Sequence, residues 1–263
     1  MPFSPWVLCQ LAGLAFASWL FFRTTRDAPF ALRVALVRAL PFTVVGALGV
    51  DYALHLTAFA LRGAHGPLPP FGGIMAYGAL FGMGGAYAYF ARRSGLSTYA
   101  SLDRVTAPLA LLVAVGRVGC FFAGCEHGKP TRTWLGVTYP STHPHFPALV
   151  RDGVVPDGAS LSHPLHPATL YEAAFALLAC ALSLVLLARP STKKGGVFFA
   201  GTLVYAGGRF VAEAFRGDLE RGAHGAFTTG QAMSLFAMGL AVSLALRENE
   251  TVAPLEEGPK TST

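Results

Sequence analysis

The sequence predicts an all-α polytopic membrane protein with about seven transmembrane helices. Of its 263 residues, 53% are hydrophobic and only 13% are charged, and the mean hydropathy is positive, a composition that soluble globular domains rarely reach. Several apolar runs are long enough for the roughly 20 helical residues that cross a hydrocarbon core of about 30 Å. The expected spans cover residues 5–22, 39–61, 71–91, 105–124, 167–188, 196–215 and 226–246.

The positions of the basic residues predict which ends of these spans face the cytoplasm. By the positive-inside rule the richer set of connections is cytoplasmic, so the N-terminus lies outside and the C-terminus inside. The net charge of +6 follows this pattern rather than one basic patch, and nucleic acid is therefore not expected as a partner. The basic set comprises Arg23, Arg26, Arg33, Arg38, Arg92, Arg93, Arg104, Arg189, Lys193, Lys194, Arg247 and Lys260.

The spans form a single transmembrane domain, residues 1–247, with one substantial outer loop at about 126–165. Loops of this length usually bind, cover or gate something. Residues 248–263 are acidic, contain proline and have no hydrophobic period, which predicts a disordered cytoplasmic tail. Gly78 and Gly82 stand at a GxxxG spacing and predict a close approach of two helices.

A few ionisable side chains lie inside the expected spans, where each costs about 2.5–3.5 kcal/mol on insertion scales and so needs a partner or a function. Tyr205, Arg209 and Glu213 follow one another at intervals of four residues, which places them in one polar stripe on a helix. A purely structural Arg209–Glu213 ion pair is the alternative. Arg117 either snorkels to the headgroups or forms, with Arg209, a clamp for an anionic phosphate.

Five motifs in order resemble those of the prolipoprotein diacylglyceryl transferase family, over nearly the whole chain. Gly116-Arg117-Val-Gly119-Cys-Phe, with later glycines at Gly124 and Gly128, is similar to the family signature Gly-Arg-x-Gly-Asn-Phe. The other four motifs are Trp134-x-Gly-Val-x-Tyr-Pro, His166-Pro-Ala-Thr-Leu-Tyr-Glu, Tyr205-x-x-x-Arg209-Phe-x-x-Glu213-x-x-Arg216 and Thr229-Gly-Gln-x-x-Ser234.

The resemblance implies a transferase of the bacterial inner membrane. It would move the sn-1,2-diacylglyceryl group of phosphatidylglycerol to the lipobox cysteine thiol of preprolipoproteins, at the outer leaflet. These two substrates and membrane lipid are the implied partners, and no cofactor or metal is expected. The implied substrate-binding residues are Arg117, Gly119 and Gly128. The implied catalytic residues are Arg209 at the phosphate or leaving group, Glu213 holding Arg209, Tyr205 orienting the stripe, and His166 and Tyr77 as candidate bases.

Three positions depart from the family pattern. Tyr77 stands where the family has a catalytic histidine, and tyrosine, with a reference pKa of about 10, is a poor base near neutrality. Cys120 stands in place of the signature asparagine, and Cys125 in place of a glutamate. Glu126 or His127 would restore some of the lost polarity, and His166 is the alternative base.

Two other functions stay open on the sequence alone. One is a thiol or metal membrane protein, in which Cys120, Cys125 and His127 form a disulfide or supply metal ligands. The other is an inactive or repurposed lipid-binding relative, which keeps the headgroup site and lacks transferase activity.

Overall fold

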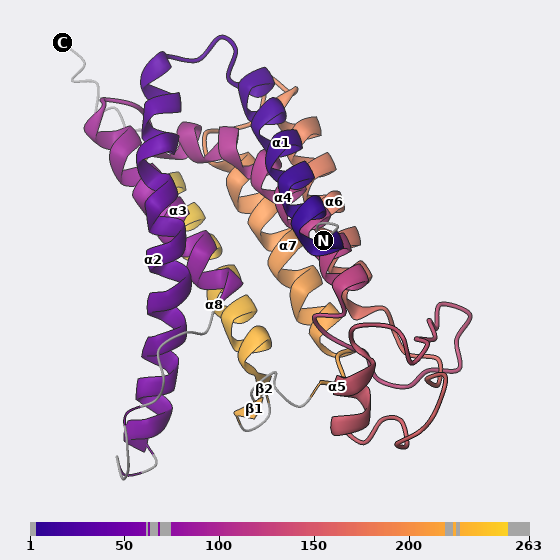
Figure 1. Cartoon of the computed structure of the whole chain (residues 1–263). Helices are drawn as coiled ribbons and strands as arrows, with labels where there is room; N and C mark the ends of the chain where they lie inside the picture. Colours follow the sequence, from indigo (N-terminus) through magenta and orange to yellow (C-terminus); the bar gives the residue numbers. More distant parts are fainter. Residues whose placement is uncertain are drawn as a thin grey trace, which may run out of the picture.

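The computed structural model describes residues 4–61, 63, 68, 75–218, 223–224 and 227–251, and these form a bundle of long helices with a folded loop at one end (Figure 1). The long helices are α1 (Pro5–Thr24), α2 (Phe30–Leu61), α3 (Ala76–Arg93), α4 (Thr98–Ala123), α6 (Ala168–Leu187), α7 (Gly196–Glu213) and α8 (Thr229–Thr251). The short elements are α5 (Phe146–Arg151) and the antiparallel pair of two-residue strands β1 (Ala223–His224) and β2 (Phe227–Thr228).

Five of these helices, α1, α2, α4, α6 and α8, are long and apolar enough to cross a membrane. The chain therefore has the helices of a polytopic membrane protein, as expected. Helices α3 and α7 are 18 residues long, but each carries two charged residues, which lowers its apolar character. Each long helix overlaps one of the seven expected spans, and the parts at 71–74 and at 226 lie outside the described residues.

Helices α2 and α4 begin earlier than the apolar runs that predicted them, so Arg33 and Arg104 lie on helices rather than in connections. Their guanidinium groups donate hydrogen bonds to carbonyl groups at the end of α1. The last carbonyls of a helix have no backbone N–H partner within it. Arg33 donates to the Thr25 carbonyl over 3.0 Å, and Arg104 to the Thr24 carbonyl over 2.5 Å. At the other terminus, α8 runs to Thr251, so the first four residues of the expected tail are helical, and the rest of it, 252–263, lies outside the described residues.

Helix α4 lies at the centre of the bundle, where it packs against α1, α3, α6 and α7, while α2 packs against α3 and α8 against α7. The α2–α3 contact confirms the close approach predicted from the glycine spacing. A Cβ on Gly78 would overlap the carbonyl oxygen of Gly46, and a Cβ on Gly82 that of Phe42. Only glycine allows the two backbones to come this close.

The two ends of the bundle differ in their connections. At the upper end of Figure 1, α1 passes to α2, α3 to α4 and α6 to α7 through short turns. Here the carboxylate of Asp103 on α4 accepts from the backbone amides of Gly195, at 2.7 Å, and Phe198, at 2.8 Å. It thus caps the first turn of α7, whose amides have no partner inside the helix.

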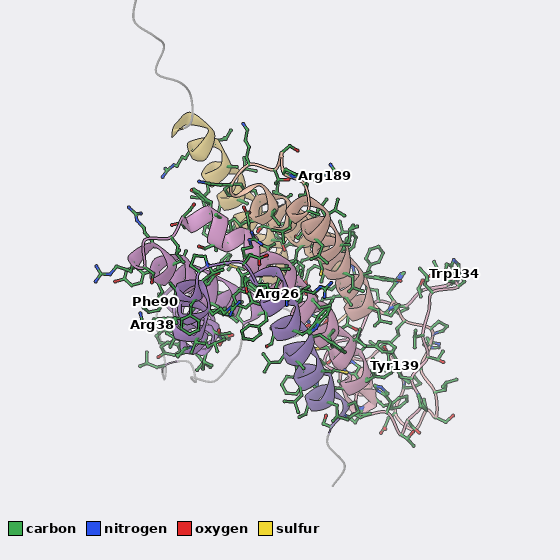
Figure 2. All side chains as sticks on the ribbon, turned by 90° about the horizontal axis from the view of Figure 1, so that it is seen from above. Arg26, Arg38, Phe90, Trp134, Tyr139 and Arg189 are labelled. Carbon is green, nitrogen blue, oxygen red and sulfur yellow. The ribbon has the colours of Figure 1, made fainter. Side chains whose placement is uncertain are left out.

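The lower end carries the long loop between α4 and α6, which folds as a unit of its own. Its chain doubles back so that Val137 pairs with Leu165 and Pro140 with Leu161 through isolated β-bridges. Trp134, at the turn, is 90% exposed, and Figure 2 shows it at the outer edge of the loop, away from the helices. The buried side chains of this loop are Tyr139, Phe146, Leu149, Val155 and Leu165.

Candidate functional site

A buried carboxylate on α6 lies at the centre of a charged cluster near the loop end of the bundle. Glu172 is 1% exposed and pairs with Nε of Arg117 on α4 at 2.8 Å and with Nη1 of Arg209 on α7 at 2.5 Å. The hydroxyl of Tyr205 donates to the same carboxylate over 2.9 Å. Helices α4 and α7 therefore bring two guanidinium groups and one phenol to a single acid on α6.

A third guanidinium, that of Arg216, extends the cluster beyond the end of α7. Oε1 of Glu126 lies 3.1 Å from Nη1 of Arg216 and 3.1 Å from Nη1 of Arg117. Glu213 pairs with Arg209 at 3.3 Å and with Arg216 at 3.4 Å. Asp218 accepts two bonds from Arg216, at 3.0 and 2.6 Å. We call this set the arginine cluster; its members are Arg117, Glu126, Glu172, Arg209, Glu213, Arg216 and Asp218.

The arginine cluster holds four carboxylates against three guanidinium groups. Burial alone would raise the pKa of Glu126, but the nearby Arg117 and Arg216 outweigh it and lower that pKa to about 2. Burial alone would lower the pKa of Arg216, but its carboxylate partners, Asp218 most of all, raise it above the ordinary value for arginine. Both groups are therefore ionised at neutral pH, as paired charges in a buried site must be.

The end of α4 determines where Glu126 lies. Gly124 has a φ of 68°, in the left-handed region, and two bonds close the turn, from the Gly124 amide to the Phe121 carbonyl and from the Cys125 amide to the Cys120 carbonyl. This is the Schellman arrangement of a helix end. It reverses the chain so that Glu126 comes back over Arg117.

The loop is also bound to the end of α7, which fixes Arg216. Gly128 forms a β-bridge with Arg216. The amide of Lys129 donates to the Phe215 carbonyl over 2.8 Å, and the amide of Gly217 donates to the His127 carbonyl over 2.9 Å. The loop and α7 therefore present their charged side chains as one rigid unit.

Four of the predicted site residues meet in or against the arginine cluster: Arg117, Tyr205, Arg209 and Glu213. Arg117 points into the bundle, with 12% of its side chain exposed, so the snorkelling alternative is wrong. The Arg209–Glu213 pair exists, but as one contact within a larger network rather than as an isolated structural pair.

The other predicted site residues lie beside the arginine cluster. The Tyr77 hydroxyl is 2.7 Å from Oγ of Ser234, and its ring centre is 6.5 Å from that of Tyr205. Nδ1 of His166 is 2.9 Å from the Tyr171 hydroxyl, so its partner is not a cluster member. The two predicted glycines contact protein. A Cβ on Gly119 would lie 2.6 Å from Cβ of Cys9 on α1, and one on Gly128 would overlap the His166 carbonyl.

The structure brings together the two cysteines of the thiol or metal alternative but not the histidine. Cys120 and Cys125 are free thiols in hydrogen-bond contact with each other. His127 instead lies 3.0 Å from Asp152 and 3.2 Å from the Gly128 carbonyl. In the described part of the chain, no group of three His, Cys, Asp or Glu side chains is placed to hold a metal ion.

Sequence reasoning missed Glu172, Arg216 and Asp218 as members of the site. Glu172 had a usable signal, because an acid inside a span needs a partner or a function, and it closes the motif that begins at His166. Arg216 follows Glu213 by three residues, a spacing at which side chains on a helix are neighbours.

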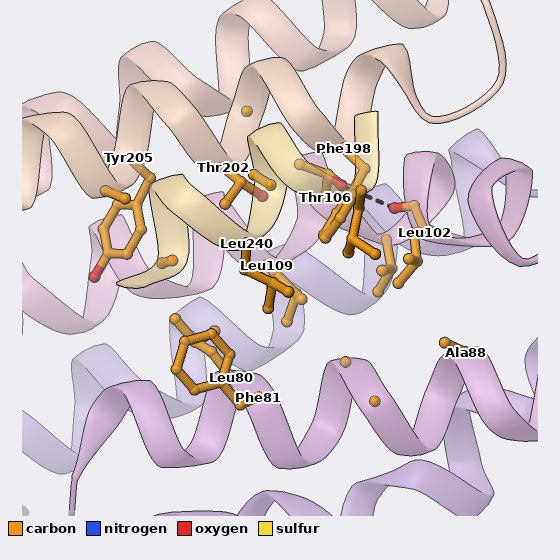
Figure 3. Close-up of a pocket in the computed structure, with 18 of the residues that line it drawn as sticks. Leu80, Phe81, Ala88, Leu102, Thr106, Leu109, Phe198, Thr202, Tyr205 and Leu240 are labelled. Carbon is orange, nitrogen blue, oxygen red and sulfur yellow. Dashed lines mark hydrogen bonds between the residues drawn. The ribbon is translucent and has the colours of Figure 1, made fainter. Parts of the chain in front are cut away.

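An apolar cavity of about 560 Å³ opens beside the arginine cluster, between α3, α4, α7 and α8 (Figure 3). Tyr77 and Tyr205 line the end next to the cluster, and Tyr99 lines the opposite end. Along α4 the lining runs from Val113 to Thr98, which at about 1.5 Å per residue is a length of about 22 Å. The charged site thus lies directly next to one end of a long apolar cavity, and Tyr205 belongs to both.

The family model of the prolipoprotein diacylglyceryl transferases matches residues 4–247. The chain belongs to this family. Among its members, the phosphatidylglycerol–prolipoprotein diacylglyceryl transferase of Enterococcus faecalis is 30% identical over 224 residues, 79% of this chain and 73% of the relative. That of Clostridium tetani is 32% identical over 166 residues, 63% of this chain and 60% of the relative.

The transferase 2 of Clostridium perfringens is 29% identical over 166 residues, 63% of this chain and 59% of that relative. The matched part of the chain thus spans about 60% of the length of the two clostridial transferases. Family membership confirms the resemblance that the five motifs carried, and the match includes every residue of the arginine cluster.

Proposed function

We propose that the chain transfers a diacylglyceryl group from phosphatidylglycerol to the lipobox cysteine thiol of prolipoproteins. Its relatives are named for this activity. The observation that supports it most is the common boundary of the arginine cluster and the apolar cavity. Phosphatidylglycerol has an anionic phosphate joined to two acyl chains, so its recognition needs guanidinium groups next to an apolar space.

In the proposed reaction, the thiolate sulfur attacks the glycerol carbon that bears the phosphate. A C–S bond forms, the C–O bond to the phosphate breaks, and glycerol phosphate leaves with the bonding electron pair. Because the phosphate gains negative charge as it leaves, fixed cationic donors stabilise the transition state more than the bound substrate. We assign this role to Arg117 and Arg209, whose planar donor forks match phosphate oxygens.

Glu172 holds the two guanidinium groups in register before any substrate arrives. Each guanidinium has five N–H donors, so a bond to Glu172 leaves donors for a phosphate. Because the fold has already ordered both arginines, binding does not have to immobilise them, which favours both affinity and rate. Glu126, Glu213 and Asp218 do the same for Arg216.

The nucleophile is the thiolate, so a base must take the thiol proton. We assign this role to His166, because histidine is the most common general base in enzymes and the residue lies on the loop side, where a peptide from outside would arrive. With His166 as the base, Tyr77 has a structural role: its bond to Ser234 holds its ring in the wall of the cavity, at the end next to the arginine cluster. The alternative, Tyr77 as base, requires a strongly perturbed phenol.

The proposal includes the topology. Helices α3 and α7 would cross the bilayer along with the five more apolar helices, giving seven spans with the N-terminus outside and the C-terminus in the cytoplasm. The basic residues at the ends of α1, α3 and α6 support this orientation. The arginine cluster then lies at the outer face of the inner membrane, where prolipoproteins emerge.

The test is transfer by the purified protein in detergent, with labelled phosphatidylglycerol and a lipobox peptide. We expect the peptide to gain the mass of one diacylglyceryl group, and a peptide with serine for cysteine to gain none. If folded protein binds phosphatidylglycerol but transfers nothing to either peptide, the chain is a lipid-binding relative without transferase activity.

A further inference from the structure

We propose that Gly84 and Gly85 on α3 determine how long an acyl chain the apolar cavity accepts. The inference rests on the proposed function, which makes a diacyl lipid the occupant of the cavity. Both glycines line the cavity. A Cβ on either of them would meet no atom within 4 Å, so no neighbouring helix requires glycine at either position.

The other two glycines of α3 behave differently. Gly78 and Gly82 face α2, and a Cβ on either would overlap its backbone. Helix packing therefore explains Gly78 and Gly82 and does not explain Gly84 and Gly85. Since glycine weakens a helix relative to alanine, two adjacent glycines with open space beside them indicate room kept for something other than protein.

The position of the pair fits the far part of an acyl chain. Gly84 and Gly85 follow Tyr77 by seven and eight residues, or about 10–12 Å along the helix axis. Tyr77 lies at the cluster end of the cavity, where the phosphate would bind. A chain of one leaflet extends over about half of the 30 Å hydrocarbon core, or about 15 Å, so its last carbons would lie at or just past the two glycines.

The preference would come from shape and not from hydrophobicity. Lipid tails are as apolar as the cavity wall, so a chain gains little by moving from the bilayer into the cavity. A chain that is too short leaves wall atoms without contacts, and one that is too long overlaps the far wall. In Figure 3, Ala88 and Phe198 belong to that wall.

The experiment compares Gly84→Leu and Gly85→Leu with two matched controls. Gly49→Leu on α2 and Gly239→Leu on α8 also place a side chain where no atom lies within 4 Å, but neither residue lines the cavity. Each variant receives a mixture of short-chain and long-chain phosphatidylglycerol. We expect the two cavity variants to shift the ratio of transfer rates about tenfold toward short chains, and the controls to keep the wild-type ratio.

Binding of the same two lipids, measured by native mass spectrometry without peptide, separates this inference from the proposed function. If the cavity variants shift binding toward the short-chain lipid but neither the wild type nor any variant transfers the diacylglyceryl group, the proposed transferase activity is refuted and the role of the two glycines is supported. An unchanged ratio in both assays, or an equal loss for both lipids in folded protein, would overturn the inference. Gly84→Ala and Gly85→Ala, which add one methyl group, should give a smaller shift in the same direction and serve if a leucine variant does not fold.

Discussion

Arginine has two different environments at the two ends of this bundle. At the loop end, Arg117, Arg209 and Arg216 have side chains 9–12% exposed and pair with carboxylates. At the opposite end, Arg33 and Arg104 donate to carbonyls that end α1. Arg33 is half-buried and Arg104 exposed, and both bond backbone carbonyls, whereas the buried arginines at the loop end need charged partners and point to chemistry.

The difference has an energetic consequence. Removing one partner of a buried pair leaves an uncompensated charge and costs about 3–5 kcal/mol, whereas a hydrogen bond from a charged group to a carbonyl contributes about 1.5–3 kcal/mol. The buried arginines should therefore dominate both stability and activity, and substitutions of Arg33 or Arg104 should have a smaller effect on stability and little effect on activity.

The largest expected effect is that of Arg209→Ala. Losing one preorganised donor to a developing charge typically costs a factor of about 10²–10³ in rate, and we expect the transfer rate to fall by about that factor. The matched control is Arg189→Ala at the opposite end of the bundle, which should keep the wild-type rate. Initial rates of labelled transfer compare the two. Equal losses in both variants would remove the distinction between the two classes of arginine.

Glu172→Gln should be the most destabilising conservative change in the arginine cluster. It keeps the shape of the side chain but leaves Arg117 and Arg209 without the charge between them, so we expect a loss of about 3 kcal/mol in unfolding free energy. Unfolding in detergent, followed by intrinsic fluorescence, measures it. A change below about 0.5 kcal/mol would mean that solvent, not Glu172, balances the two guanidinium groups.

Glu126 should make stability depend on pH in the acid range. Its pKa falls from 4.5 to about 2 on folding, so the folded state favours the ionised form. The stabilisation is present above about pH 5 and is lost as the pH falls toward 2, with a total of up to about 3 kcal/mol. Comparing unfolding temperatures between pH 7 and pH 3 tests this. The drop should be smaller in Glu126→Gln, and an equal drop in both proteins would assign it to other groups.

The smallest expected effect is that of Tyr77→Phe. It removes the hydroxyl that bonds to Ser234, worth about 1 kcal/mol of stability, and should leave transfer within about threefold of the wild type. His166→Ala should instead lower the rate by a factor of about 10² or more, as for a general base. If the two variants exchange these outcomes, Tyr77 is the base.

The apolar runs predicted the helices because length and hydropathy alone decide whether a segment can cross a bilayer. They placed the starts of α2 and α4 too late, since a helix continues past the hydrocarbon core wherever side chains such as Arg33 can bond the end of a neighbour. The motif spacing predicted the Tyr205, Arg209 and Glu213 stripe, which depends only on the geometry of one helix.

The rest of the site depends on contacts between helices that the sequence does not reveal. Glu172 is 37 residues from Arg209 along the chain, and no periodicity within one helix relates them. Glu126 reaches Arg117 only because Gly124 reverses the chain at the end of α4. Cys120, Cys125 and His127 are close in sequence, yet His127 turns away to Asp152. Proximity along the chain thus predicted the contact of the two cysteines but not the position of His127, and the packing of α4, α6 and α7 decided the charged site.

The central claim is that the buried arginines recognise the phosphate of the donor lipid, and direct binding tests it most closely. Binding of phosphatidylglycerol and of uncharged diacylglycerol should be compared in the wild type, Arg117→Ala and Arg189→Ala. We predict that wild type and Arg189→Ala prefer phosphatidylglycerol by about tenfold or more, and that Arg117→Ala loses most of this preference. Retention of the full preference in folded Arg117→Ala would contradict the account.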